Sequence, residues 1–217
     1  MSEITPQLVK TLRDKTNAGM MDCKRALAEA GGDLEKAEDL LRKKGIVSAG
    51  KKSTRATKEG VIASYIHMQG KVGVLVEINC ETDFVAKNES FRDFVKDITL
   101  HIAASSPICV SRDQVCPALV AREREIAVGQ IEEEGKKSGK PKPANIVEKI
   151  VDGKIDKFLA SICLLDQPFI KNPDQTIEEF VKSKIAELGE NIIIRRFTRY
   201  VVGEALDAAA PAAEAAE

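Results

Sequence analysis

A short segment in the first half of the chain places an acid and an aromatic side chain directly after an apolar run. Apolar residues alternate from Val72 to Ile78, as in a strand, and Thr82, Asp83, Phe84 and Val85 follow. An outward-pointing aromatic ring here would suit a protein interface, because such rings carry much of the binding energy of interfaces. Alternatively, the threonine caps a helical turn, the aspartate favours its dipole, and the two apolar residues pack inward. The local pattern leaves both interpretations open.

Side chains for covalent chemistry are sparse. We interpret the only two histidines, His67 on an expected strand and His101 in an expected helix, as structural or partner-facing. No Ser-His-Asp set, His-x-x-x-His pair or complete phosphate loop occurs. The segment from Gly45 to Lys52 approaches a phosphate loop, but Lys52 stands where Ser or Thr should reach magnesium, and a helix precedes it. We expect no enzyme active site, cofactor, metal site or direct nucleotide binding.

The cysteines do not indicate a disulfide framework or a zinc site, because their number is odd and no Cys-x-x-Cys pair occurs. We interpret them as reduced and mostly buried small apolar residues. They are Cys23, Cys80, Cys109, Cys116 and Cys163. Whether one of them bridges two subunits is left open.

The composition is that of a globular protein. Of the 217 residues, 31% are charged and 43% are hydrophobic, and 33 basic residues nearly balance 34 acidic ones. Bulk charge therefore does not favour nucleic acid or a membrane as a partner. No apolar run approaches the roughly 20 residues of a membrane helix, and the first residues do not resemble a signal peptide, so we expect a cytoplasmic protein.

The N-terminal part predicts three short helices. The first covers residues 4–16 with Thr5 as its cap, the second carries Cys23 to Ala30, and Asp33 caps a third that ends at Gly45. Met20 and Met21 begin the second helix. Their spacing fits ordinary core residues as well as an adaptable contact surface.

A basic stretch without acidic residues runs from Arg42 to Lys58. We interpret residues 46–58 as a solvated linker. A nucleic-acid patch is the minor alternative, because this stretch has no aromatic residue on which a base could stack.

The main domain predicts an antiparallel sheet with helices. Residues 60–79 form a hairpin around the Gln69-Gly70 turn, and a third strand covers residues 192–202. Between them, one helix carries the Phe91 to Ile102 stripe, and two more form an antiparallel helical hairpin. The predicted class is α+β: a three-helix bundle, then a three-stranded antiparallel sheet packed with helices and a helical hairpin.

Several segments resemble one family in their order and spacing. They are Ala18 to Leu27, Thr82 to Val85, Asn145 to Lys154, Leu164 to Lys171, and Gly189 to Glu204. Together with the stretches between them, they cover nearly the whole chain from Ile4 to Leu206. The chain resembles the elongation factor Ts family.

The resemblance implies a domain plan. Residues 1–45 would form a bundle similar to the ubiquitin-associated domain, and residues 59–206 a dimerisation-type α+β core. The linker of residues 46–58 joins them, and the Ala-rich composition of residues 207–217 predicts a disordered tail. The chain is similar to short family members, which have one core unit and act as homodimers. The dimer interface is left open.

The resemblance also implies a function and its residues. Members of the family bind elongation factor Tu with GDP and promote GDP release by displacing the magnesium and phosphate-binding elements. The wedge would be Phe84 beside Asp83, flanked by Thr82 and Val85. Met20, Met21 and Lys24 would form a second contact, although the sequence does not say which of them reaches the partner.

Two alternatives stay open. An RNA-binding accessory protein of the translation apparatus would use Arg42 to Lys58 and Lys136 to Lys142, and its affinity would fall steeply with salt. An enzyme of another kind has no supporting set of residues.

Overall fold

The computed structural model describes residues 4–16, 18–138 and 143–204. The predicted disordered tail, residues 207–217, lies outside the described residues, as does most of the turn between the two hairpin helices. No helix in the described ranges combines the length and apolar character needed to cross a membrane.

The N-terminal bundle contains α1 (Pro6–Thr16), α2 (Met20–Glu29) and α3 (Leu34–Lys52). The Thr5 hydroxyl accepts a hydrogen bond from the Leu8 N–H at 3.3 Å. The Asp33 carboxylate accepts two, from the N–H groups of Glu35 and Lys36, both at 3.1 Å. Apolar side chains from all three helices meet in one cluster: Val9, Leu12, Cys23, Ala26, Leu27 and Ala37. The three predicted helices and their caps at Thr5 and Asp33 are confirmed.

The predicted end of the third helix at Gly45 is wrong. The helix α3 continues through Gly45 to Lys52, so part of the predicted linker is helical. A Cβ atom at Gly45 would lie 3.2 Å from the Ala186 Cβ of α8 (Ile177–Leu188). The glycine thus permits close packing of two helices, and this tertiary contact outweighs its weak helix propensity of about 1 kcal/mol.

The sheet has the predicted topology. Its strands are β1 (Glu59–His67), β2 (Val72–Cys80) and β5 (Ile192–Val201), in the order β1-β2-β5 and antiparallel throughout. A short 3-10 turn, η1 (Met68–Gly70), joins the first two strands. Alternate residues of β2 from Val72 to Cys80 are buried, so one face of the sheet packs on the core and the other is open.

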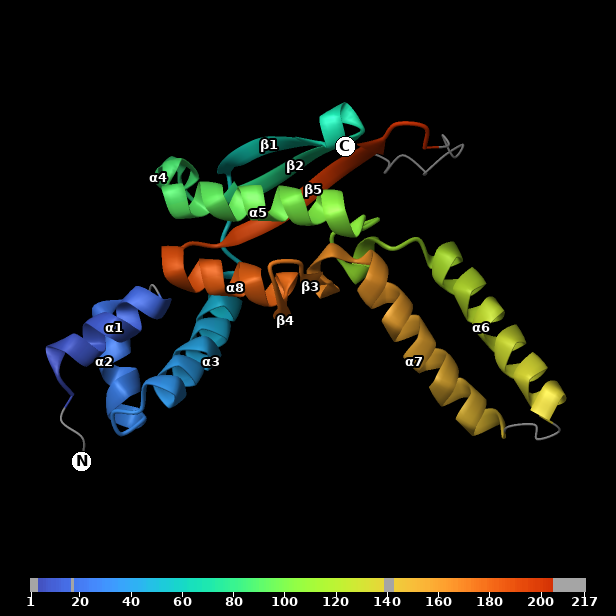
Figure 1. The fold of residues 1–217 in the computed structure, drawn as a ribbon, viewed down its shortest axis with the longest axis horizontal. Coiled ribbons are helices and arrows are strands. Elements are labelled where there is room, and N and C mark those ends of the chain that lie inside the picture. The colour runs from blue at the N-terminus through green and yellow to red at the C-terminus, as the bar shows by residue number, and fades with distance from the viewer. Residues whose placement is uncertain (1–3, 17, 139–142, 205–217) are drawn as a thin grey trace.

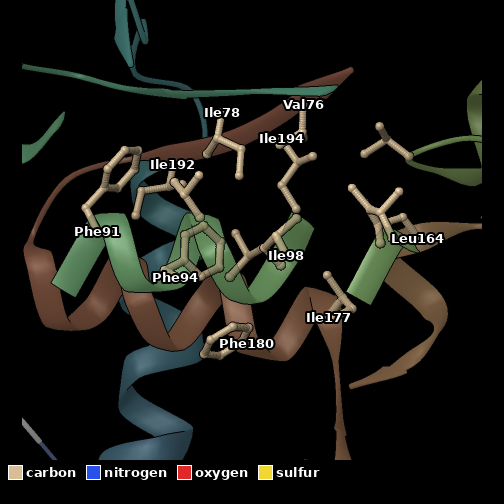
Figure 2. Close-up of a cluster of buried hydrophobic side chains, with 14 of the residues drawn as sticks. Val76, Ile78, Phe91, Phe94, Ile98, Leu164, Ile177, Phe180, Ile192 and Ile194 are labelled. Carbon is tan, nitrogen blue, oxygen red and sulfur yellow. The ribbon is translucent and has the colours of Figure 1, made fainter. Parts of the chain in front are cut away.

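Two helices cover that packed face in successive layers (Figure 1). Directly on the sheet lies α5 (Glu89–Ser105), and α8 packs on the far side of α5. Figure 2 shows Phe91, Phe94 and Ile98 of α5 between the sheet and Phe180 of α8. The stripe predicted from Phe91 to Ile102 is buried along its length. The predicted α+β class is confirmed by this sheet and its covering helices.

The helix α8 was not identified separately from the sequence. Its N-terminus is a capping box: the Thr176 hydroxyl accepts from the Glu179 N–H, and the Glu179 carboxylate accepts from the Thr176 N–H, both at 3.2 Å. Threonine followed three residues later by glutamate, before an apolar stripe, was the available signal. A small two-stranded ribbon of β3 (Pro168–Phe169) and β4 (Asn172–Thr176) precedes it.

The helical hairpin is also confirmed. It consists of α6 (Pro117–Ser138) and α7 (Ala144–Ile162), which project from the body opposite the bundle (Figure 1). The two helices share a small cluster of Ala127, Ile131, Val151 and Ile155. Short turns, η2 (Arg112–Gln114) and η3 (Leu164–Asp166), lie at its base. Two polar pairs also join the helices, Arg124 with Asp152 and Lys154 with Gln130. Both are exposed, so they contribute little to the free energy of folding.

Candidate partner-binding site

The acid and the aromatic residue lie on α4 (Asp83–Lys87), a five-residue helix that follows β2. The Thr82 hydroxyl caps it by accepting from the Val85 N–H at 3.4 Å. Phe84 is 82% exposed, whereas Val85 packs against the core and Ala86 is buried. The structural interpretation is therefore right for the cap and for Val85, and wrong for Phe84, which points outward.

A fixed negative charge stands beside this ring. The Lys87 Nζ donates to the Asp83 carboxylate at 2.7 Å, one helical turn along. This hydrogen bond is the main reason that the pKa of Asp83 lies below its ordinary value, and the first-turn position favours the ionised form as well. At neutral pH the segment thus presents an exposed apolar ring next to an ionised carboxylate.

The segment is tied to the connection between α8 and β5. The Glu190 carboxylate accepts hydrogen bonds from the Glu81 N–H at 3.1 Å, the Thr82 N–H at 3.0 Å and the Thr82 hydroxyl at 2.6 Å. No local sequence pattern marks this contact, because Glu190 lies far along the chain from Thr82.

The second predicted contact lies on the bundle. Met20 and Met21, the first residues of α2, are 56% and 67% exposed, and Lys24 is exposed as well. The interpretation of both methionines as ordinary core residues is wrong. Helices α2 and α4 lie at the same end of the molecule, away from the helical hairpin (Figure 1).

The two histidines belong to no cluster of reactive groups. His101 is fully buried, with its Nε2 3.0 Å from the Gln167 Oε1, and its Nδ1 accepts from the Ile170 N–H at 3.4 Å. Burial lowers its pKa, so the ring is neutral. His67 Nδ1 lies 2.9 Å from the hydroxyl of Tyr65 on the same strand. Both arrangements are structural.

Other candidate chemistry does not assemble either. The near-match to a phosphate loop, Gly45 to Lys52, is helical, so its backbone N–H groups cannot cradle a phosphate. The cysteines are free, and among the described residues no group of three or more His, Cys, Asp or Glu could hold a metal ion.

Comparison with known proteins identifies the family of the chain. A family model described as elongation factor TS matches residues 46–204. The chain belongs to the elongation factor Ts family. A protein named Elongation factor Ts from Cyanothece sp. is 57% identical over 208 residues, which are 95% of this chain and 77% of that protein. Proteins of the same name from Alkaliphilus metalliredigens and Citrifermentans bemidjiense are 55% and 57% identical, over 94% of this chain and 92% and 91% of theirs.

Membership of the elongation factor Ts family makes this chain a translation factor. The matched region contains α4 and the whole sheet, and the matches to relatives extend over most of the bundle too. The aligned residues cover more than nine-tenths of the Alkaliphilus and Citrifermentans proteins.

Proposed function

We propose that this chain is a guanine nucleotide exchange factor that binds elongation factor Tu with GDP and promotes release of the GDP. The observation that carries the proposal is the outward orientation of Phe84 on a capped turn fixed to the core. Burial of such an exposed apolar ring by a partner stabilises the complex, and aromatic anchors of this kind dominate interface energetics.

The ring acts by displacing elements of the partner. A GTPase holds its nucleotide through backbone N–H groups around the phosphates and through a magnesium ion with strict octahedral geometry. Packed side chains cannot be compressed, so insertion of Phe84 behind this site shifts the neighbouring helix and phosphate loop. Asp83 contacts polar groups nearby, and Thr82 and Val85 hold the turn that presents both side chains. Met20, Met21 and Lys24 form a second contact.

Exchange is then a coupling between two ligands of elongation factor Tu. The factor and GDP each lower the affinity of the other by the same free energy. A coupling of about 4 kcal/mol corresponds to roughly a thousandfold weakening of GDP binding. In this proposal no covalent bond forms or breaks, and the chain itself binds no nucleotide.

The decisive experiment measures GDP release. Elongation factor Tu loaded with a fluorescent GDP analogue is mixed in a stopped-flow instrument with wild type or with Phe84→Ala. We expect fast release with wild type and a loss of about a hundredfold in catalytic efficiency with the variant, as for the removal of a strong interface anchor. Unchanged release with wild type would overturn the proposal. RNA binding with a steep salt dependence, in the same preparation, would favour the accessory-protein alternative instead.

We also propose a homodimer in which the open faces of two sheets pack together. The strand register places Ile62, Leu75 and Tyr200 on this face, and all three are exposed. Gly73 lies on the same face, opposite Ile66 of β1. A Cβ atom at Gly73 would lie 3.4 Å from the Ile66 Cδ1. The same face also carries the Arg196–Glu77 ion pair. Exposed apolar residues on an open sheet are suited to a second copy of that face, because two sheets pack about 10 Å apart.

The oligomeric state tests this second proposal. Light scattering after gel filtration should give a dimer mass for wild type and a monomer mass for Leu75→Asp. Ile108→Asp changes another exposed apolar residue, which lies outside the sheet, and it should leave the dimer intact. A monomeric wild type at micromolar concentration would contradict the pairing.

A further inference from the structure

The turn between α8 and β5 holds the segment before Phe84 through the Glu190 carboxylate, which accepts three hydrogen bonds. One oxygen of Glu190 accepts from the backbone N–H groups of Glu81 and Thr82, and the other accepts from the Thr82 hydroxyl. Hydrogen bonds to an ionised acceptor are stronger than neutral ones, and three on one group fix its geometry. Both N–H groups lie beyond the end of β2, where no strand is left to pair with them.

The neighbouring residue completes the attachment. The Asn191 N–H donates to the Glu81 carboxylate at 2.6 Å. Its side-chain Nδ2 donates to the carbonyl oxygens of Ser53 and Arg55 at 3.3 and 2.9 Å, and the residue is almost fully buried. Glu190 and Asn191 therefore join three separate parts of the chain: the end of α3, the segment before α4, and the start of β5.

The helix α4 needs such an attachment. Five residues are too few for a helix to be stable by itself, because nucleation of a helix is unfavourable. The exposed Phe84 ring contributes nothing to holding the helix in place. The cap at Thr82 does contribute, and its hydroxyl proton is directed to Glu190, which leaves an oxygen lone pair free for the Val85 N–H. The position of the cap, and with it the direction of Phe84, thus depends on Glu190.

We infer that Glu190 is a positioning residue for nucleotide exchange, which acts through Thr82 to hold Phe84 in its outward, binding-competent direction. This inference rests on the proposed function. A ring that is already oriented loses less conformational freedom when it binds, so the attachment raises the efficiency of exchange without itself touching the partner.

The test is a double-mutant cycle in the GDP-release assay. We expect Glu190→Ala to lower catalytic efficiency about five- to tenfold, the range set by the freedom of one immobilised side chain. In the Phe84→Ala background the same change should have no further effect, because the ring that it positions is absent. Amide hydrogen exchange should show loss of protection at Glu81 and Thr82. A general loss of stability would lower efficiency in both backgrounds and would reduce protection at many amides. An effect that is absent without Phe84, with loss of protection confined to Glu81 and Thr82, is therefore specific to the positioning role.

Three further variants sharpen the test. Glu190→Gln can accept both backbone N–H groups on its Oε1 and donate to the Thr82 hydroxyl, so it should keep most of the activity. Glu178→Ala removes a carboxylate of α8 that pairs with Lys182, and it serves as the matched control with unchanged exchange. If Glu190→Ala does not fold, Glu190→Asp retracts the carboxylate by one methylene group and should show an intermediate loss.

The outcomes separate the two ideas. Wild type that fails to accelerate GDP release overturns the proposed function. Wild-type activity that depends on Phe84 but is unchanged in Glu190→Ala, or losses that multiply in the double variant, overturn the positioning role and leave the exchange function standing.

Discussion

The helices α4 and α5 carry the same residue type in opposite environments. Phe84 on α4 is 82% exposed, whereas Phe91 on α5 is fully buried. A single residue separates the helices: Asn88 ends α4, with its N–H bonded to the Val85 carbonyl, and caps α5 by accepting from the Ser90 N–H at 2.8 Å. The difference teaches that position relative to the sheet, not residue type, decides between a stabilising and a binding role.

The two helices also differ in how they are held. A full apolar stripe buries α5 between the sheet and α8, so α5 is positioned by packing. Only Ala86 of α4 is buried, and the helix is positioned by hydrogen bonds at Thr82 and Glu190. Hydrogen bonds have strict geometry, so they suit a segment that must hold an exposed side chain in one direction. Apolar packing supplies most of the free energy of folding, so it suits a core helix.

The sharpest test of this comparison is the pair of alanine substitutions. Phe91→Ala should lower the free energy of unfolding by about 3–5 kcal/mol, the usual cost of deleting a buried ring. Phe84→Ala should change it by less than about 0.5 kcal/mol, since an exposed side chain makes few contacts. Chemical denaturation of both variants measures the two values. Equal destabilisation would break the distinction between the two helices.

The second contact should have a smaller effect than Phe84. Replacing Met20 and Met21 together by alanine removes two adaptable apolar side chains from the start of α2. We expect affinity for elongation factor Tu to fall about tenfold, since most contacts outside a hot spot contribute about 1 kcal/mol or less each. Titration calorimetry measures the change. Met68→Ala, also exposed but on the turn of the sheet, is the control and should leave affinity unchanged.

Burial also predicts how stability depends on pH. The folded protein holds His101 with a pKa below the ordinary value of about 6.5, so the unfolded chain binds its proton more readily. The stabilising contribution is complete above about pH 6.5 and declines as the pH falls below it, by at most about 1.4 kcal/mol per pH unit. Unfolding curves between pH 5 and 7.5 should show this slope. His101→Gln should flatten it, and His67→Gln should not.

The smallest effect concerns the thiols. Burial raises the pKa of Cys80 to about 11, and burial with the neighbouring Cys163 raises that of Cys109 to about 12. Cys23 and Cys163 are fully buried, and Cys116 is exposed. Iodoacetamide at pH 7.5 should therefore modify Cys116 first in the folded protein, as peptide mass mapping would show. Modification of Cys109 at a comparable rate would contradict its raised pKa.

Much of the fold was predictable from local patterns. The capped helices of the bundle, the sheet hairpin, the third strand and the helical hairpin each carry a periodicity over enough residues to be read without neighbours. The end of α3 could not be predicted in this way. A glycine near the end of a helical pattern normally marks a stop, and only the packing of Ala186 against Gly45 shows that the helix continues. The helix α8 had a readable signal in its capping box that was not used.

The sequence by itself determined which residues form the elements, because hydrophobic periods and caps act between near neighbours. It also marked Thr82 to Val85 as a place of interest, through its order among the other family segments. Only the tertiary structure decided that Phe84 points outward, because a five-residue helix is too short to show an apolar stripe. The attachment by Glu190 likewise needed the fold, since it joins residues that meet only when β5 pairs with β2.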